Sequence, residues 1–255
     1  MELDTDRGAG ASFAAWRAEM AKELRTLAAL HAAEVDADVI RRLGEANYPA
    51  ESVLPIDDDG SRRAVDLMCG AVSELRDATS KEIDELAVDY AAIYLTGALH
   101  LSPNESAWLD EDHLERQQPM FEVRAWYERY GVRAADWRCR PEDNLSLQLS
   151  FIATLLELQD VKAAMSEAAS FMDQHLLRWL GDFSSGVALR CSTKFYAALA
   201  LYTSSLTRAL RDVVGELGGI PRREIPLSAD AQPVRDENAA AARPLRYFPG
   251  VAPSW

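Results

Sequence analysis

Residues 171–210 read FMDQHLLRWLGDFSSGVALRCSTKFYAALALYTSSLTRAL, and this stretch indicates the fold class. Its apolar side chains recur three to four residues apart, which is the spacing of an amphipathic helix. We predict two consecutive helices joined near Ser184, Ser185 and Gly186, where the spacing is interrupted. The two apolar stripes are Phe171, Leu176, Trp179, Leu180 and Phe183, and then Phe195, Leu199, Tyr202, Leu206 and Leu210.

The same helical spacing recurs along most of the chain, and no segment shows the alternation or the β-branched enrichment of a sheet. Asp143 or Asn144 can cap the helix that begins beside them, and Gly131 is a C-cap candidate. We therefore predict an all-α fold, a single globular bundle of about ten helices. The expected helices before residue 171 cover 13–27, 35–43, 62–75, 81–95, 110–130 and 144–156, and the expected loops cover 48–60 and 97–108.

Composition divides the chain into a helical domain and a tail. With 255 residues, of which 48% are hydrophobic, the chain is long enough to bury a substantial core. Six of the eleven prolines lie between Pro221 and Pro253, which is typical of an irregular tail. We predict one domain over residues 1–215, with a hinge near 137–144, and a Pro/Ala-rich tail over 216–255.

The net charge of −14 argues against a nucleic-acid partner, because phosphate binding requires clustered Lys and Arg. Acids and bases balance over residues 216–255, so the whole negative excess lies on residues 1–215. There it either favours a basic partner or is ordinary solubility charge. The N-terminus is acidic and no apolar run is long enough for a membrane span, so we expect a cytoplasmic protein without stable membrane insertion. The cysteines, Cys69, Cys139 and Cys191, suggest neither a disulfide framework nor a zinc site.

The sequence offers little catalytic chemistry. It contains no phosphate loop, no dinucleotide fingerprint, no nucleophile elbow and no HExxH pair. The cluster Asp110–Asp112 with His113 is more typical of solvated side chains at a helix start than of a metal site. We therefore predict that the protein is not an enzyme and holds no cofactor or metal.

Three segments together carry a resemblance to a known family. Residues 90–101 are followed by Ser-Pro-Asn-Glu-Ser-Ala-Trp (102–108), where the family has a PYESxY-type loop. After QQPMFEVRAWYERYGV (117–132), residues 140–145 read RPEDNL, where the family carries EPxDH. HLLRW (175–179) and FYAAL (195–199) match its HLxxW and FYxxL signatures. Over residues 80–212 the chain thus resembles the TorD/DmsD/NarJ family of cytoplasmic redox-enzyme maturation chaperones.

The resemblance implies a helical chaperone that binds the twin-arginine signal peptide, the apo catalytic subunit, or both, of an exported molybdenum-containing oxidoreductase. Such a protein assists cofactor insertion and prevents premature export, as a monomer or a helix-swapped homodimer. One alternative is an assembly factor for the apo subunit that scarcely binds the leader, as in the nitrate-reductase branch. A nucleotide-binding enzyme is a weaker alternative because no motif supports it.

A leader-binding site needs carboxylates for guanidinium groups beside an apolar groove. Asp143 and Glu142 are the charged candidates, and Pro141 matches the family motif. Arg140 and Asn144 stand where the family has Glu and His, so any pH-sensitive role of that histidine is expected to be missing. The alternative interpretation is purely structural: these candidates are core residues, turn residues or a helix cap. The groove candidates are Tyr94, Leu95, Pro103, Trp108, Pro119 and Phe121.

Overall fold

The computed structural model describes residues 3–49, 54, 58–135 and 140–222. Within these residues the chain forms ten α-helices, one π-helical turn and one 3₁₀ turn, and no strand. The prediction of an all-α bundle of about ten helices is confirmed. The elements are α1 (Leu3–Ala32), α2 (Ala37–Glu45), α3 (Asp59–Glu74), α4 (Ser80–Tyr90), η1 (π, Ala91–Leu95), α5 (Ser106–Leu109), α6 (Gln118–Arg129), α7 (Leu145–Leu156), α8 (Val161–Gln174), η2 (3₁₀, Leu176–Arg178), α9 (Leu180–Arg190) and α10 (Lys194–Gly218).

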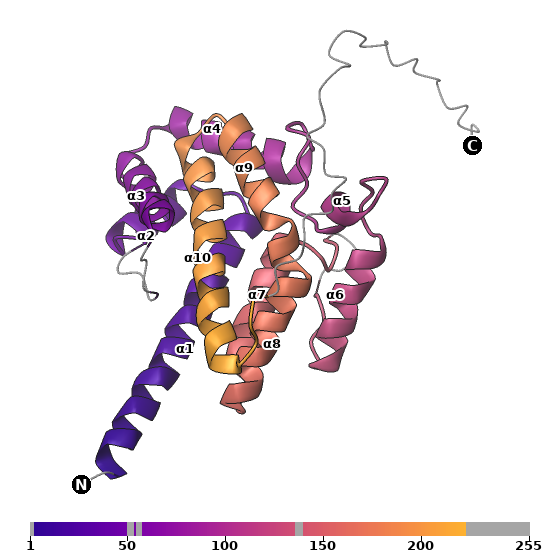
Figure 1. Cartoon of the computed structure of the whole chain (residues 1–255). Helices are drawn as coiled ribbons and strands as arrows, with labels where there is room; N and C mark the ends of the chain where they lie inside the picture. Colours follow the sequence, from indigo (N-terminus) through magenta and orange to yellow (C-terminus); the bar gives the residue numbers. More distant parts are fainter. Residues whose placement is uncertain (1–2, 50–53, 55–57, 136–139, 223–255) are drawn as a thin grey trace. The chain divides into compact units, whose positions relative to one another are not determined.

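Helix α10 is the central wall of the bundle and contacts α3, α8 and α9 (Figure 1). Its predicted apolar stripe is buried over its whole length, from Phe195 to Leu210. Helix α1 packs along α7, and the Arg17 guanidinium donates from Nε to the Leu156 carbonyl at 2.7 Å. A cation at the carboxyl end of a helix satisfies carbonyls that have no partner within the helix, so Arg17 fixes α1 against the end of α7.

The predicted junction at Ser184, Ser185 and Gly186 is wrong, because all three residues lie inside α9. Glycine does not end a helix by itself, and here Leu101 packs so closely that a Cβ on Gly186 would lie 2.5 Å from its Cδ2. The Ser184 hydroxyl donates to the Ala200 carbonyl on α10 at 2.9 Å. The actual interruptions are the 3₁₀ turn before α9 and a short connection before α10.

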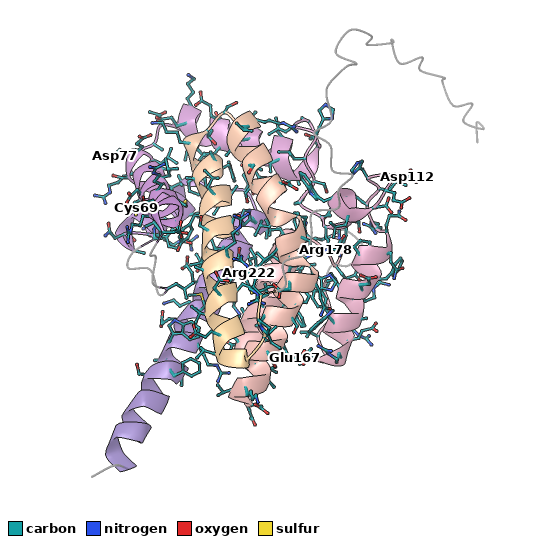
Figure 2. The ribbon with its side chains drawn as sticks, viewed as in Figure 1. Cys69, Asp77, Asp112, Glu167, Arg178 and Arg222 are labelled. Carbon is teal, nitrogen blue, oxygen red and sulfur yellow. The ribbon has the colours of Figure 1, made fainter. Side chains whose placement is uncertain are left out.

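The predicted helix over 110–130 is also too long, because α6 begins only at Gln118. Asp110 accepts the backbone N–H groups of Asp112 and Leu114, and His113 and Arg116 have positive φ values of 54° and 61°. These turn conformations are incompatible with a continuing helix. Figure 2 shows Asp112 on this loop, between α5 and α6. At the other end of α6 the C-cap is Tyr130, and Gly131, which was predicted to be the cap, follows it with the left-handed φ of 68° that ends the helix.

Helix α10 continues to Gly218, beyond the predicted domain end at residue 215. The tail from residue 223 and residues 137–139 of the predicted hinge lie outside the described residues. None of the described helices is both long and apolar enough to cross a membrane.

The crossing of α10 over α8 depends on Gly218, and replacing it with alanine should lower the free energy of unfolding by about 1–3 kcal/mol. A Cβ at Gly218 would lie 2.6 Å from the backbone nitrogen of Ser166 and 2.8 Å from its Cα, and backbone cannot move aside as a side chain can. The matched control is Gly70→Ala on the exposed side of α3, where nothing lies within 4 Å. That variant should gain about 0.4–1 kcal/mol. Urea unfolding followed by circular dichroism measures both, and equal stability of the two variants would contradict this role of Gly218.

Candidate functional site

Two segments that are far apart in the sequence pair at the centre of the candidate site. Asn104 and Asn144 form an isolated antiparallel bridge, and the Glu105 N–H donates to the Asp143 carbonyl at 3.1 Å. The pairing joins the segments that resemble the family's two loop motifs. We call residues 102–106 and 140–144 the paired segments.

Asp143 is a buried carboxylate that holds the paired segments together. Its Oδ2 accepts the backbone N–H of Ser106 at 2.7 Å and the Ser106 hydroxyl at 2.5 Å. Burial raises the pKa of Asp143, an effect that the two Ser106 hydrogen bonds oppose. Asp143 does not cap α7; Asn144 does, because its side-chain oxygen accepts the Ser146 N–H at 3.1 Å.

Glu105 connects the paired segments to α7 and to the end of α8. Its Oε2 accepts from Gln148 Nε2 at 2.7 Å, and its Oε1 lies 3.0 Å from His175 Nδ1. All three side chains are buried, so each depends on the others for its hydrogen bonds. Burial raises the pKa of Glu105, and the hydrogen bond with His175 opposes that shift. His175 is therefore a hydrogen-bonded core histidine.

A hollow of about 420 Å³ opens beside the π-helical turn, and we call it the η1 cavity. The Thr96 N–H bonds the Ala91 carbonyl five residues back, and this π geometry brings Tyr94 and Leu95 to the cavity. Leu95 is 68% exposed, so its apolar side chain is accessible at this cavity. The other lining residues are His31, Ala32, Tyr90, Ile93, Gly97, Leu101, Pro103, Asn104, Glu115, Arg116, Arg140, Pro141 and Asn144.

His31 forms part of the floor of the η1 cavity and is itself buried. Its Nε2 lies 2.9 Å from the Thr203 hydroxyl, which donates its own hydrogen to the Leu199 carbonyl. Thr203 must therefore accept from Nε2–H, which leaves Nδ1 to accept from the Tyr94 hydroxyl at 2.6 Å. Burial lowers the pKa of His31 to about 3, so this ring is neutral near pH 7.

A second hollow, of about 340 Å³, lies on the other side of residues 140–144, and we call it the α6 pocket. Arg124, Tyr127 and Glu128 of α6 line it together with Glu142 and residues 132–134. Arg124 Nε donates to Glu142 Oε1 at 2.8 Å, and the Tyr127 hydroxyl donates to the Glu142 carbonyl at 2.9 Å. The pocket therefore has a fixed carboxylate on its wall.

The predicted site residues separate into groups. Tyr94, Leu95, Pro103 and Pro141 line the η1 cavity, whereas Glu142 lines the α6 pocket.

The remaining predicted residues line neither of these two hollows, and each has a different place. Asp143 is fully buried between the paired segments. Trp108 is half-buried, stacks on Trp179 and donates from Nε1 to the Ser102 carbonyl at 2.8 Å. Phe121 is exposed on α6, where Arg124 lies over its ring, and Pro119 lies in the first turn of the same helix.

Sequence reasoning missed the residues that bind the site together. Glu105 and Ser106 belong to the segment that carries the resemblance, and Gln148 is the one amide side chain in a mostly apolar helix. A buried amide in such a helix requires hydrogen-bond partners, so Gln148 was the residue in the sequence that could have indicated a buried polar network. Gln148 and its partner Glu105 are 43 residues apart in the sequence, and Ser106 and its partner Asp143 are 37 residues apart. No local sequence pattern reveals contacts over such separations.

Comparison with known proteins places this site in a family. The family model described as nitrate reductase delta subunit matches residues 58–185, about half of the chain. "Chaperone protein TorD" of Vibrio cholerae is 27% identical over 162 residues, which are 60% of this chain and 70% of that protein. The TorD chaperone of Shewanella pealeana is 27% identical over 153 residues (57% and 66%). "Chaperone protein YcdY" of Escherichia coli is 27% identical over 137 residues (54% and 69%). The chain therefore belongs to the nitrate reductase delta subunit family, the group that includes the TorD, DmsD and NarJ chaperones.

Proposed function

We propose that this protein is a cytoplasmic chaperone that binds the twin-arginine signal peptide, the apo catalytic subunit, or both, of an exported molybdenum-containing oxidoreductase. In that role it assists cofactor insertion and prevents premature export. The observation that carries the proposal is the position of the family match, because residues 58–185 contain both paired segments and nearly all of the η1 cavity lining. Relatives named as chaperones support the same reading.

The geometry suits recognition of a partner. The buried polar side chains of the paired segments bond to one another, so they fix the shape of the walls. Leu95 presents an exposed apolar side chain next to Tyr94 and Pro103 at the η1 cavity. An apolar helical stretch of a leader buries its side chains in a hollow of this kind, which is how amphipathic helices bind grooves.

Replacing Leu95 with alanine should weaken binding of a twin-arginine leader by about tenfold, which corresponds to about 1.4 kcal/mol of lost apolar burial. The measurement is titration calorimetry against synthetic leaders from the same genome, with versions in which both arginines are alanine. Leu189→Ala is the matched control, because Leu189 is 84% exposed on α9 and does not line the cavity. Absence of binding to every leader tested would contradict the leader-binding part of the proposal.

A second candidate is an assembly factor that holds the apo catalytic subunit and scarcely binds the leader. The family match favours keeping this candidate, because the matching model is described by a nitrate reductase subunit. Co-purification with a catalytic subunit whose leader has been deleted distinguishes the two. Retention of that subunit, together with no leader binding, would support the second candidate.

A further inference from the structure

Residues 140–144 form a wall with a different hollow on each side. Arg140, Pro141 and Asn144 face the η1 cavity, and Glu142 faces the α6 pocket. The apolar candidates and the carboxylate that the sequence placed in one site therefore lie on opposite sides of one backbone segment. A positively charged group of a partner can therefore bind in only one of the two hollows beside these residues.

The η1 cavity is unfavourable for a cation. Arg116 and Arg140 both line it, and Glu115 is the one carboxylate among its lining residues. Glu115 Oε1 already accepts from the Ser102 hydroxyl at 2.7 Å and from Asn104 Nδ2 at 2.9 Å. A guanidinium entering here would meet two like charges and a single carboxylate, one of whose two oxygens is already engaged in two hydrogen bonds.

The α6 pocket differs in its carboxylates, because two of them, Glu128 and Glu142, line it together with two arginines, Arg124 and Arg133. The Glu142 side chain is 8% exposed, and its Oε2 has no hydrogen-bond partner among the described residues. A buried carboxylate oxygen without a donor is costly, and a donor entering from the pocket removes that cost. Glu128 lines the same pocket and adds a second negative charge, and Glu142 and then Glu128 raise the pKa of Arg124.

The protein also holds the acceptor in place before any ligand arrives. The Tyr127 hydroxyl fixes the Glu142 carbonyl, and Arg124 fixes Oε1, so Oε2 cannot turn away without breaking a bond of 2.8 Å. A fixed carboxylate loses little conformational freedom when a forked guanidinium binds it.

We propose that the α6 pocket, and not the η1 cavity, receives a guanidinium group of the bound partner, with Glu142 Oε2 as its acceptor and Glu128 as a supporting charge. The inference rests on the proposed function in that the guanidinium belongs to the leader peptide. The leader then lies across residues 140–144, with its apolar stretch at Leu95 and its basic end at α6.

Two substitutions on the same ion pair test this assignment by calorimetry with a synthetic twin-arginine leader. Glu142→Gln should weaken binding at least about tenfold and remove the difference between the leader and its double-alanine version. Arg124→Gln should tighten binding by a few-fold, because the removal of a competing cation outweighs the loss of the bond that fixes Oε1. If the pair only held the structure, both variants would weaken binding, since each breaks the same bond.

The matched control is Glu167→Gln. Glu167, labelled in Figure 2, pairs with Arg129 at the end of α6, so it has the same chemistry outside the pocket. This variant should bind the leader as the unmodified protein does. Weakening as large as that of Glu142→Gln would overturn the assignment to the pocket.

A small probe separates this inference from the proposed function. Agmatine carries a guanidinium but no leader sequence, and at millimolar concentration it should shift the amide resonances of Tyr127 and Glu128 in the intact protein but not in Glu142→Gln. Leader binding that is unaffected by Glu142→Gln would overturn the inference and leave the proposed function standing. Agmatine shifts without binding of any leader would support the pocket and contradict the leader-binding function.

Discussion

Replacing Glu105 with alanine is expected to lower the free energy of unfolding by about 3–5 kcal/mol, the range seen when one partner of a buried polar pair is removed. Glu105 is fully buried, and it is the shared partner of His175 and Gln148. The alanine would leave the His175 ring without its Glu105 partner and would create a cavity beside it. Urea unfolding at pH 7, followed by circular dichroism, measures the loss.

Glu105→Gln is the control for this prediction. Glutamine keeps the shape and one acceptor oxygen for Gln148, and its amide N–H can donate to His175 Nδ1 when the other ring nitrogen carries the hydrogen. A neutral side chain also suits a site that raises the pKa of Glu105 by burial. It should lose less than half as much as the alanine variant. A loss below about 1 kcal/mol in Glu105→Ala, the size of an ordinary surface effect, would show that the side chain does not join these elements.

The second large effect is a loss of stability on acidification that depends on His31. The pKa of His31 is about 3 in the folded protein because the ring is buried, and about 6.5 in an unfolded chain. Below pH 6.5 the unfolded chain binds a proton that the folded protein does not, so stability falls as the pH falls. The loss is about 1.4 kcal/mol per pH unit, or about 2 kcal/mol by pH 5, and it continues toward pH 3.

His31→Gln should remove this dependence, because an amide can donate to Thr203 and accept from Tyr94 without titrating. Burial also raises the pKa values of Glu23, Glu105 and Asp143, which makes the folded protein gain stability as the pH falls through those values. Because these groups are present in both proteins, their contributions to the pH dependence cancel when the two stabilities are subtracted. The measurement is the stability difference between the variant and the unmodified protein from pH 7 to 5, and a constant difference would contradict the prediction.

Helical periodicity predicted the bundle because most helices bury one continuous stripe, as α10 does from Phe195 to Leu210. It failed where tertiary contacts override local preference. Gly186 stays helical under Leu101, while the helix before it ends at His175, whose ring bonds Glu105. Local pattern alone places neither feature, because the contacting residues are distant in the sequence.

The candidate site was predictable in its segments but not in its geometry. The motif-like runs identified both paired segments, since their Pro, Asn and Glu residues differ from the helices around them. Residues 141–144 form a turn, in which the Asn144 N–H donates to the Pro141 carbonyl at 3.1 Å, and within this turn Pro141 and Glu142 line different hollows. Adjacency in sequence had suggested a single site.

The central position of α10 determines when the bundle can form during synthesis. Helix α10 is the last described helix, yet it forms the wall against α3, which lies near the start of the chain. During synthesis the apolar faces of the earlier helices therefore remain uncovered until α10 has been translated. The bundle closes only after α10 has been made, so until then the newborn chain exposes apolar faces of the kind that cause aggregation.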